Sequence, residues 1–477
     1  MKKFDIRSYN AVGDGTTNDT AAIRAALDAC AQAGGGTVFF PPGHYLTGTL
    51  RLPDNTTLHL DNGAVLIEQY QEGMEAVVVG QAKQGKSARP HLICAKGARN
   101  IAICGHGEIH GRGASDDCGG DARKRGFRSG VIFLVDCIGV RLNDFTIRHG
   151  DAWTVHLHGC EEVFVQGVSI LNNLFRRGGN DGLDLNCCRN VLVANCRIEA
   201  WDDCIVLKTR DRDTPGDARE KTCENIVVTN CLFRTGCTAL KIGSESKGDF
   251  RDIHFSNCAI RESSVGFGIY LLDGATVERV TVSDISMEIV PDFRYRKNDE
   301  PYFQHAWPIS LYVDRRHPES PLGCIRDIVL RDIQACSDHG AVFLGNPDSP
   351  IENLTLQNVT LRATNPRPYF PRLLPCHSEL LENRDSVQRA SDWWRYPNYH
   401  SELIPARPSE LPPYRPAYFN FDEIVDLRLD NVKVYQTAEA ACDNPRVSMA
   451  FQSVCNAAID HCGRRLEGGD WQRFSFA

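Results

Sequence analysis

The chain has 477 residues, of which 42% are hydrophobic and 24% charged, as in an ordinary soluble globular protein. Its formal net charge of −8 argues against nucleic acid or an anionic membrane as the main partner. A chain this long exceeds the usual single domain, although a repeat fold can reach this length as one unit.

No stretch of 18 or more residues is continuously apolar, so we expect no membrane-spanning helix. The first residues, Met1–Arg7, lack the apolar core of a signal peptide. This predicts a cytoplasmic protein, or a secreted one if a leader has been removed. The 20 cysteines form no C-x-x-C pair, and we expect them to be buried free thiols in a reducing compartment.

The N-terminal region, residues 4–66, begins with a short strand and a turn rich in Gly, Asn and Asp. An amphipathic helix is expected at about residues 20–33, because apolar residues recur there with helical spacing and a run of glycines ends it. Three strands should follow, at Thr37–Phe40, Thr47–Leu52 and Thr57–Leu60, separated by Pro, Gly and Asn.

Ten segments of one pattern follow, beginning near residue 99. From the second onward, each reads as two short strands of alternating polar and apolar residues, joined at a Gly, Asn or Asp that favours a turn. The apolar residues that follow this turn are Phe145, Val168, Cys196, Cys231, Cys258, Ile285, Ile333, Val359 and Val432. Most steps between them are 23 to 28 residues, and the longer ones mark insertions.

A period in the twenties with two or three strands per repeat is typical of a parallel β-solenoid. Leucine-rich repeats share the period, but their L-x-x-L-x-L-x-x-N pattern is missing. We therefore predict an all-β fold, a right-handed parallel β-helix of about ten or more coils, with the N-terminal helix covering one open end. It would form a single domain over 1–477: N-terminal cap and first coils at 1–66, regular coils at 99–434 and a C-terminal cap at 435–477.

Two insertions, 289–323 and 364–421, interrupt the repeat and are rich in Pro, Arg and aromatic residues. Long loops on a rigid scaffold commonly carry function. Their rings could stack on sugars along a groove, or they could pack a subunit interface and form a homo-oligomer. Both interpretations stay open.

Residues 179–208 carry four aspartates, namely Asp181, Asp184, Asp202 and Asp203. Asp181 lies 21 residues before Asp202, which would place the two on adjacent coils of a solenoid. Glycosidic bonds are usually cleaved by two carboxyl groups, one donating a proton to the leaving oxygen and the other activating water or attacking. Clustered carboxylates suit this role, because repulsion raises the pKa of one of them.

The alternative is that these aspartates are only turn residues of the solenoid. Asp202 and Asp203 argue against it, because two adjacent acids precede the apolar strand 205–207 and follow Trp201.

Five segments resemble motifs of one enzyme family. They are residues 9–45, an N-terminal region; 105–113, a G-x-G-x-I-x-G-x-G turn; 151–156, which holds a Trp and a His; 179–184, like N-T-D-G-x-D; and 201–204, like G-D-D-C. Together they resemble the polygalacturonase-type glycoside hydrolases of family 28 over nearly the whole chain. The resemblance implies that Asp202 is the general acid, while Asp181 and Asp203 position and activate water. The anomeric configuration would be inverted, and Asp184 would support the site through hydrogen bonds.

The chain departs from the family at two motifs. Thr238 stands where G-H-G-x-S-I-G has its His, and Tyr270–Asp273 replaces the R-I-K motif that grips a galacturonate carboxylate. Lys241 and Glu245 are new polar residues beside the first motif. Lys241 could offset the missing cations or be a solvated or ion-paired surface residue. Further cations that could bind an acidic sugar are Arg176, Arg177, Lys208 and Arg210.

The sequence thus predicts a glycosidase without metal or cofactor, acting from one end of a plant- or microbe-derived, pectin-like oligosaccharide. Its expected substrate-binding residues are Trp153, His156, Asp184, Lys208, Thr238, Lys241, Glu245 and Tyr270. Two other functions stay open: a β-helix polysaccharide lyase or fructan-type transglycosylase, and a non-catalytic carbohydrate-binding solenoid.

Overall fold

The computed structural model describes residues 2–69, 91–113, 129–174, 179–209, 222–290, 307–337, 340–364, 417–438 and 447–473. They divide into two compact units, Met1–Thr235 and Gly236–Ala477, and each is described by itself. That the chain forms a single domain stays a prediction.

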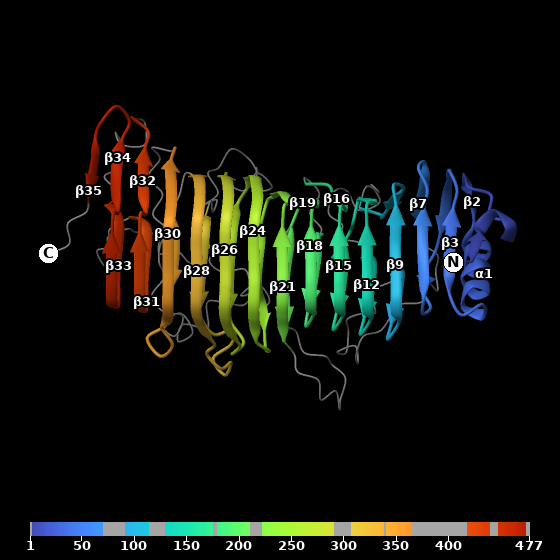
Figure 1. Ribbon diagram of the computed structural model, residues 1–477, viewed down its shortest axis with the longest axis horizontal. Helices are drawn as coiled ribbons and strands as arrows, with labels where there is room; N and C mark the ends of the chain where they lie inside the picture. Colours follow the sequence, from blue (N-terminus) through green and yellow to red (C-terminus); the bar gives the residue numbers. More distant parts are fainter. Residues whose placement is uncertain are drawn as a thin grey trace, which may run out of the picture. The chain divides into compact units, whose positions relative to one another are not determined.

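The first unit consists of three stacks of parallel strands, in which each strand pairs with its equivalent in the next coil (Figure 1). Stack A contains β5 (Leu50–Arg51), β8 (His91–Lys96), β11 (Gly130–Val135), β14 (Val155–His158), β17 (Leu183–Asn186) and β20 (Ile205–Thr209). Stack B contains β1 (Lys3–Asp5), β3 (Gly36–Phe40), β6 (Thr56–Leu60), β9 (Arg99–Gly105), β12 (Ile138–Asn143), β15 (Glu161–Gln166), β18 (Arg189–Ala194) and β21 (Cys223–Thr229). Stack C contains β2 (Asp14–Asn18), β4 (Gly43–Thr47), β7 (Ala64–Glu68), β10 (Glu108–His110), β13 (Thr146–Arg148), β16 (Ser169–Leu171), β19 (Arg197–Ala200) and β22 (Leu232–Thr235).

The second unit has two parallel stacks. Stack D contains β23 (Thr238–Ser246), β25 (Val265–Leu271), β27 (Trp307–Val313), β29 (Ala341–Leu344) and the first part of β31 (Ala417–Asp430). Stack E contains β24 (Phe250–Ser263), β26 (Thr276–Ile289), β28 (Cys324–Ser337), β30 (Ile351–Ala363), the rest of β31, β32 (Lys433–Gln436), the second part of β33 (Val447–Asp460) and β34 (Gly463–Leu466). The first part of β33 pairs with the first part of β31 in stack D. β35 (Trp471–Arg473) pairs antiparallel with β34. The predicted parallel β-helix is confirmed.

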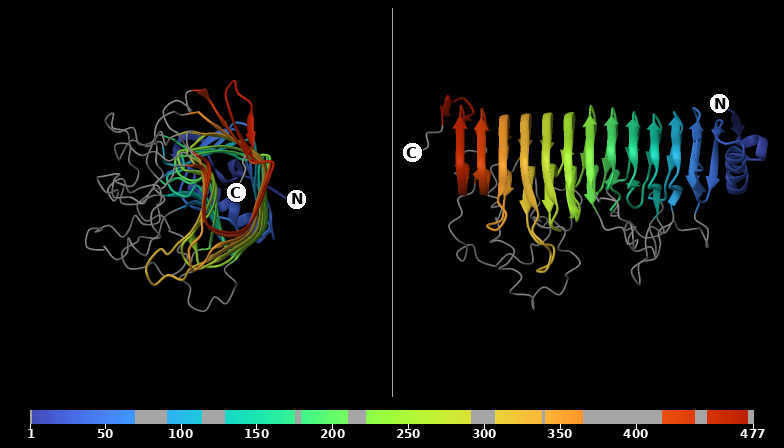
Figure 2. Two further views of the ribbon diagram at one scale, coloured as in Figure 1. Left: turned by 90° about the vertical axis from the view of Figure 1, so that its left-hand side faces the viewer. Right: turned by 60° about the horizontal axis from the view of Figure 1, so that its bottom comes forward.

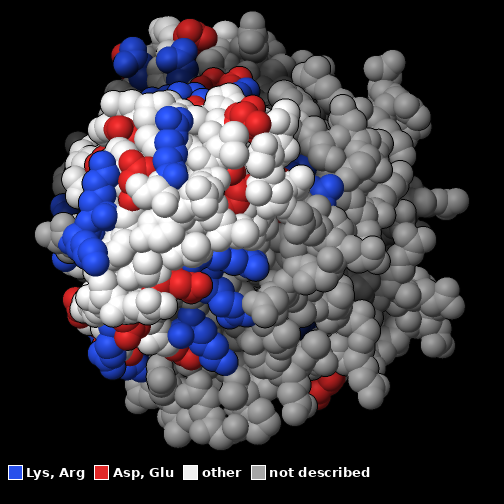
Figure 3. Space-filling model, turned by 90° about the vertical axis from the view of Figure 1, so that its right-hand side faces the viewer, with Lys and Arg blue, Asp and Glu red and all other residues white. Residues whose placement is uncertain are grey.

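The predicted capping helix is confirmed as α1 (Thr20–Gln32), which follows the short 3-10 helix η1 (Ile6–Tyr9). Its buried residues, Ile23, Ala26, Leu27 and Cys30, face the first strands, and α1 contacts β1, β3 and β5 (Figures 1 and 2). Figure 3 shows the face at this end of the first unit, where basic and acidic side chains lie interspersed among uncharged ones. A helix and mixed charges over an open end disfavour strand pairing between copies.

The turn between the two strands of each repeat has the predicted backbone conformation. All nine predicted turn residues have a positive φ, between 50° and 68°: Asp144, Gly167, Asn195, Asn230, Asn257, Asp284, Asp332, Asn358 and Asn431. Gly, Asn and Asp tolerate this left-handed region best. Each is followed by a buried apolar residue, so the sequence pattern and the coil geometry agree.

Three regions differ from the sequence-based prediction. The expected strand Thr47–Leu52 is broken, because β4 ends at Thr47 and β5 begins at Leu50. The expected insertion 289–323 contains the buried strand β27, where Trp307 packs against Val265 and Val342 instead of lining a groove. The coils also continue beyond residue 434, where only a cap was expected, because β33 pairs in parallel with β31. Residues 291–306 and 365–416 of the two insertions lie outside the described residues.

The described cysteines are free thiols, and most of them are buried, as predicted. Cys137, Cys160 and Cys188 donate to backbone carbonyl oxygens, so they behave as small core residues that satisfy a polar group. Within the parts of the chain that the structure describes, no helix has the length and apolar character needed to span a membrane.

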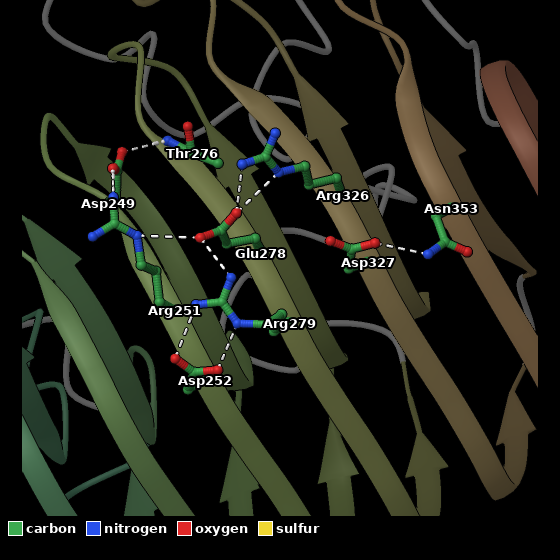
Figure 4. A network of polar contacts seen from close by, with 9 residues as sticks. All are labelled: Asp249, Arg251, Asp252, Thr276, Glu278, Arg279, Arg326, Asp327 and Asn353. Atoms are coloured by element: carbon green, nitrogen blue, oxygen red, sulfur yellow. Dashed lines mark hydrogen bonds and ion pairs between the residues drawn. The ribbon is translucent and has the colours of Figure 1, made fainter.

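Glu278 of β26 lies at the centre of a polar network on stack E (Figure 4). Its carboxylate contacts Arg279 at 2.7 Å, Arg326 at 2.6 Å and Arg251 at 3.2 Å. These residues come from three neighbouring strands, β24, β26 and β28, so the network ties successive coils together by their side chains.

Candidate active site

The four aspartates come together in the first unit, where two coils are adjacent. Asp181 precedes β17 by two residues, and Asp203 precedes β20 by two. The backbone N–H of Gly182 donates to the carbonyl oxygen of Asp203 at 2.8 Å, and β17 and β20 then pair in parallel. The 21-residue spacing therefore has the predicted consequence of bringing the two acidic clusters side by side.

The four carboxyl groups differ in their exposure. Asp181, Asp184 and Asp203 are buried, whereas Asp202 is half-buried. A carboxylate oxygen of Asp202 lies within 4.8 Å of one of Asp203. Of the four, Asp202 is thus the group best placed to reach a molecule arriving from solvent, as a proton donor to a leaving oxygen must.

Lys208, on β20, neutralises part of this charge. Its ammonium lies 2.7 Å from Asp184 Oδ1 and 3.2 Å from Asp181 Oδ2, and its side chain is 5% exposed. The Trp153 ring covers the ammonium, with the ring centroid 3.6 Å from Nζ. Lys208 was expected to bind substrate, but in the structure its charge is occupied by two carboxylates of the site.

The pKa values of Asp181 and Asp184 are both raised, primarily by burial, which disfavours the charged form. At Asp181 the negative charges of Asp184, Asp202 and Asp203 raise the pKa further, while Lys208 lowers it. Lys208 also lowers the pKa of Asp184 through its charge and its hydrogen bond. Burial and repulsion between carboxylates thus raise the pKa values of Asp181 and Asp184, and the ammonium of Lys208 opposes both effects.

His156 and Trp153 lie beside the acids, as expected. His156 on β14 is opposite Asp184 in the register of stack A. Its ring stacks on Phe133 at 4.6 Å and meets Trp153 edge to face at 4.9 Å. These contacts hold the imidazole and indole as a packed wall next to Asp184.

Asn180 and Asn172 were missed by the sequence analysis. The Asn180 side chain accepts from the backbone N–H of Trp201 at 2.9 Å and donates to the carbonyl of Gly150 at 3.3 Å. Asn172 donates to the Asn180 carbonyl at 3.0 Å and to Thr154 Oγ1 at 2.8 Å. Both amides are buried and link three consecutive coils, so they fix the turns that carry Asp181 and Asp202. The sequence signal for Asn180 was its place within the segment 179–184, and nothing marked Asn172, which lies eight residues earlier.

The remaining predicted residues among those that the structure describes, Thr238, Lys241, Glu245 and Tyr270, belong to the second unit. Thr238 and Lys241 are buried on β23, and Lys241 Nζ lies 5.4 Å from the ring centroid of Tyr270. Lys241 is therefore not a solvated surface residue, which was one of the alternatives, and its role in offsetting the missing cations stays a prediction. Glu245 is half-buried. Tyr270 on β25 packs against Tyr312, with their ring centroids 4.9 Å apart.

The segment that replaces R-I-K carries an acid that is already paired. Arg316 Nε donates to Asp273 Oδ1 at 2.7 Å, and its Nη2 donates to Oδ2 at 2.8 Å. The bidentate pairing engages the Arg316 guanidinium with a carboxylate of the protein itself. Arg176, Arg177 and Arg210 lie outside the described residues.

Comparison with known families shows which family the chain belongs to. The model of the glycosyl hydrolases family 28 matches residues 44–302, which is more than half of the chain. The chain belongs to glycosyl hydrolase family 28. It is therefore a glycosidase by family, and the motifs of its two acidic clusters lie inside the matched segment.

Relatives within family 28 are distant. A probable polygalacturonase of Vitis vinifera is 25% identical over 370 residues, which cover 74% of this chain and 73% of the relative. An exo-poly-alpha-D-galacturonosidase of Dickeya chrysanthemi is 26% identical over 315 residues, which cover 56% of this chain and 51% of the relative. The alignment thus spans about half of that second protein.

Two solved structures show the same fold. The family 28 exopolygalacturonase of Yersinia enterocolitica superposes with a TM-score of 0.69 at 18% identity, covering 96% of this chain and 78% of the other. The exopolygalacturonase of Thermotoga maritima superposes with a TM-score of 0.62 at 19% identity, covering 76% of this chain and 87% of the other. At these identities the likeness supports the fold and not the substrate.

Proposed function

We propose that this family 28 protein hydrolyses a glycosidic bond with inversion, using Asp202 as the acid and Asp181 with Asp203 as the base. The proposal depends on one observation, the convergence of half-buried Asp202 with buried Asp181 and Asp203 on adjacent coils. Asp202 gives its proton to the glycosidic oxygen as the bond to the anomeric carbon breaks. A water attacks that carbon from the opposite face and loses its proton to the Asp181–Asp203 side.

We propose a pectin-like oligosaccharide as the substrate. Support comes from the names of two relatives, a probable polygalacturonase and an exo-poly-alpha-D-galacturonosidase. The sugar should differ from plain galacturonate, however, because Tyr270–Asp273 supplies none of the cations of R-I-K, and the guanidinium of Arg316 is already paired with Asp273. Losing a bidentate Arg and a Lys removes most of the binding energy for a carboxylate.

We further propose that cleavage proceeds from one end of the chain. Relatives described as exo-acting support this, namely the Dickeya enzyme by sequence, while the Thermotoga and Yersinia structures share the fold. A digest of a long polymer would then release one short product while viscosity falls slowly. Rapid loss of viscosity with products of mixed length would reject exo action.

The decisive experiment is a panel of aryl glycosides and of pectic, fructan and algal oligosaccharides, with products followed by proton NMR. The expected result is release of a reducing sugar whose first-formed anomer is inverted relative to the substrate. Unsaturated products that absorb in the ultraviolet would indicate a lyase instead. Binding by calorimetry without turnover would indicate a carbohydrate-binding protein and would overturn the proposal.

A further inference from the structure

Lys208 occupies an enclosed position among the acids. Its ammonium contacts Asp184, on β17, and Asp181, in the turn before β17, while the Trp153 ring closes another side. The side chain is 5% exposed, and the partner carboxylates of Asp181 and Asp184 are 4% and 0% exposed. A lysine ammonium has three N–H donors and no acceptor. Two of these donors are accounted for by the carboxylates, and the ring face attracts the remaining charge.

This arrangement does not suit a residue that anchors an acidic sugar. A substrate carboxylate would have to displace Asp181 or Asp184 from the ammonium, and either would then be a buried charge without its partner. Leaving a buried charge uncompensated is strongly unfavourable. Lys208 therefore acts within the protein, on the two aspartates that it contacts.

The charges around Asp181 indicate how Lys208 acts on the two aspartates. Asp181 receives repulsion from Asp184, Asp202 and Asp203, and burial further disfavours its ionised form. Two histidines face this region from the neighbouring coil: His156 lies opposite Asp184, and His158, on the same strand, lies opposite Asn186. Among the described residues of the first unit, Lys208 is the cation that the structure pairs with Asp181 and Asp184. A base that takes a proton from water must be ionised when the water attacks.

We propose that Lys208 is a positioning residue whose ammonium holds the Asp181 carboxylate in place and favours its charged form, so that Asp181 can accept the proton of the attacking water. The inference depends on the proposed hydrolysis only for its catalytic consequence. Asp184 has the complementary task of holding the ammonium from the other side, at 2.7 Å. Trp153 shields the ion pair from water, which strengthens an electrostatic contact.

Replacing Lys208 with methionine tests this idea, because Met keeps most of the length and the unbranched apolar body of the side chain but has no charge. An opposite charge within hydrogen-bond distance changes a carboxyl pKa by about 1–3 units. The acidic limb of kcat/KM against pH should therefore move to higher pH by about 1–3 units in K208M. On the acidic side the rate falls about tenfold per unit of this shift, and KM for a neutral substrate stays near its wild-type value.

Two further variants separate charge from packing. Lys208→Arg keeps the positive charge and should keep the wild-type acidic limb. The double variant K208M/D184N removes a negative charge together with the positive one, so its acidic limb should return toward that of the wild-type protein. This double variant also tests the proposal if arginine does not fit the enclosed site.

Lys96→Met is the matched control. Lys96 is exposed and lies in the same row of stack A as Lys208, through Val135, His158 and Asn186. K96M should keep the wild-type pH profile. A K208M enzyme whose pH profile coincides with that of wild type while KM rises would overturn the proposal, because that pattern belongs to a residue that binds substrate.

A measurement without substrate distinguishes failure of this inference from failure of the proposed function. In K208M the folded-state pKa values of Asp181 and Asp184 rise further above the unfolded values. Groups raised in this way stabilise the fold below the unfolded pKa and lose that contribution as pH increases. The thermal midpoint of K208M should thus fall further below that of wild type at pH 7 than at pH 4. If the thermal midpoint of K208M lay below that of wild type by the same amount at both pH values, the proposed effect of the Lys208 charge would be refuted, even if no substrate is found.

Discussion

The backbone N–H of Gly182 donates to the carbonyl oxygen of Asp203 at 2.8 Å, and this bond joins the two acidic clusters across adjacent coils. The position has no room for a side chain, because a Cβ on Gly182 would lie 2.6 Å from the carbonyl oxygen of Cys204. The close approach of the two turns therefore depends on glycine, and it brings Asp181 next to the pair Asp202 and Asp203.

Asp202→Asn should abolish glycosidase activity and leave the fold intact, because the amide has nearly the same shape but has no proton to donate as an acid. A general acid contributes about 10²–10⁴-fold to the rate, so a loss of that size is expected in kcat. An unchanged thermal midpoint of D202N would show that its fold is intact. Asp284→Asn is the control, because Asp284 is an exposed turn residue with φ of 56°, where Asn is equally suited. Wild-type kcat in D202N would refute the acid assignment.

Asn180→Ala should lower kcat by about 10- to 100-fold with a smaller effect on KM, because a small misplacement of a catalytic group costs this much. The change leaves the backbone N–H of Trp201 without its 2.9 Å acceptor, next to Asp202. It should also lower the free energy of unfolding by about 1–3 kcal/mol, since a buried donor is left unsatisfied. Kinetics and urea unfolding of N180A are compared with those of N62A, at an exposed asparagine. Unchanged kcat in N180A would show that Asn180 has no part in placing the acid.

Glu68→Gln should make the stability of the protein less dependent on pH. Burial raises the pKa of Glu68 from 4.5 to about 7. A carboxyl raised in this way stabilises the fold below its unfolded pKa, and the contribution is lost as pH rises through the folded pKa. The wild-type protein should thus lose up to about 3 kcal/mol between pH 4.5 and above pH 7, a loss that E68Q avoids. Thermal midpoints across this range test it, with exposed Glu162→Gln as the control. Parallel curves for E68Q and wild type would contradict it.

Glu278→Gln should lower the free energy of unfolding by about 1 kcal/mol at low ionic strength, because it removes the charge at the centre of three ion pairs (Figure 4). Hydrogen bonds from Arg326, with further help from Arg279, hold the pKa of Glu278 below its usual value. The contribution is therefore present above the unfolded pKa and is lost as pH falls through the folded one.

Urea unfolding of E278Q at low and high salt checks this effect, since salt screens exposed charges. Glu288→Gln, an exposed change on the same strand β26, is the control. If the loss in free energy of unfolding of E278Q persisted unchanged at high salt and at acid pH, the loss would come from packing rather than from charge.

Several features followed from the sequence because they are local. A turn residue such as Asn195 can be predicted from its residue type, because few side chains tolerate a positive φ. The residue after it is apolar because it enters the core. The juxtaposition of Asp181 with Asp202 followed from the period alone. The break in the expected strand Thr47–Leu52 could not be predicted, because a two-residue interruption leaves no mark in the sequence pattern. The burial of Trp307 could not be predicted either, because an aromatic residue in an insertion can line a groove or enter the core.

The sequence by itself determined the coil, its turns and the pairing of the two acidic clusters, because a repeat period converts spacing along the chain into neighbourhood between coils. Only the tertiary structure decided what each charge contacts. Lys208 lies 24 residues from Asp184 and 27 from Asp181, and no periodic pattern says that its ammonium is buried between them under Trp153. Burial and charge pairing depend on all the side chains that converge at one point, so the role of Lys208 could be inferred only after the coils were stacked.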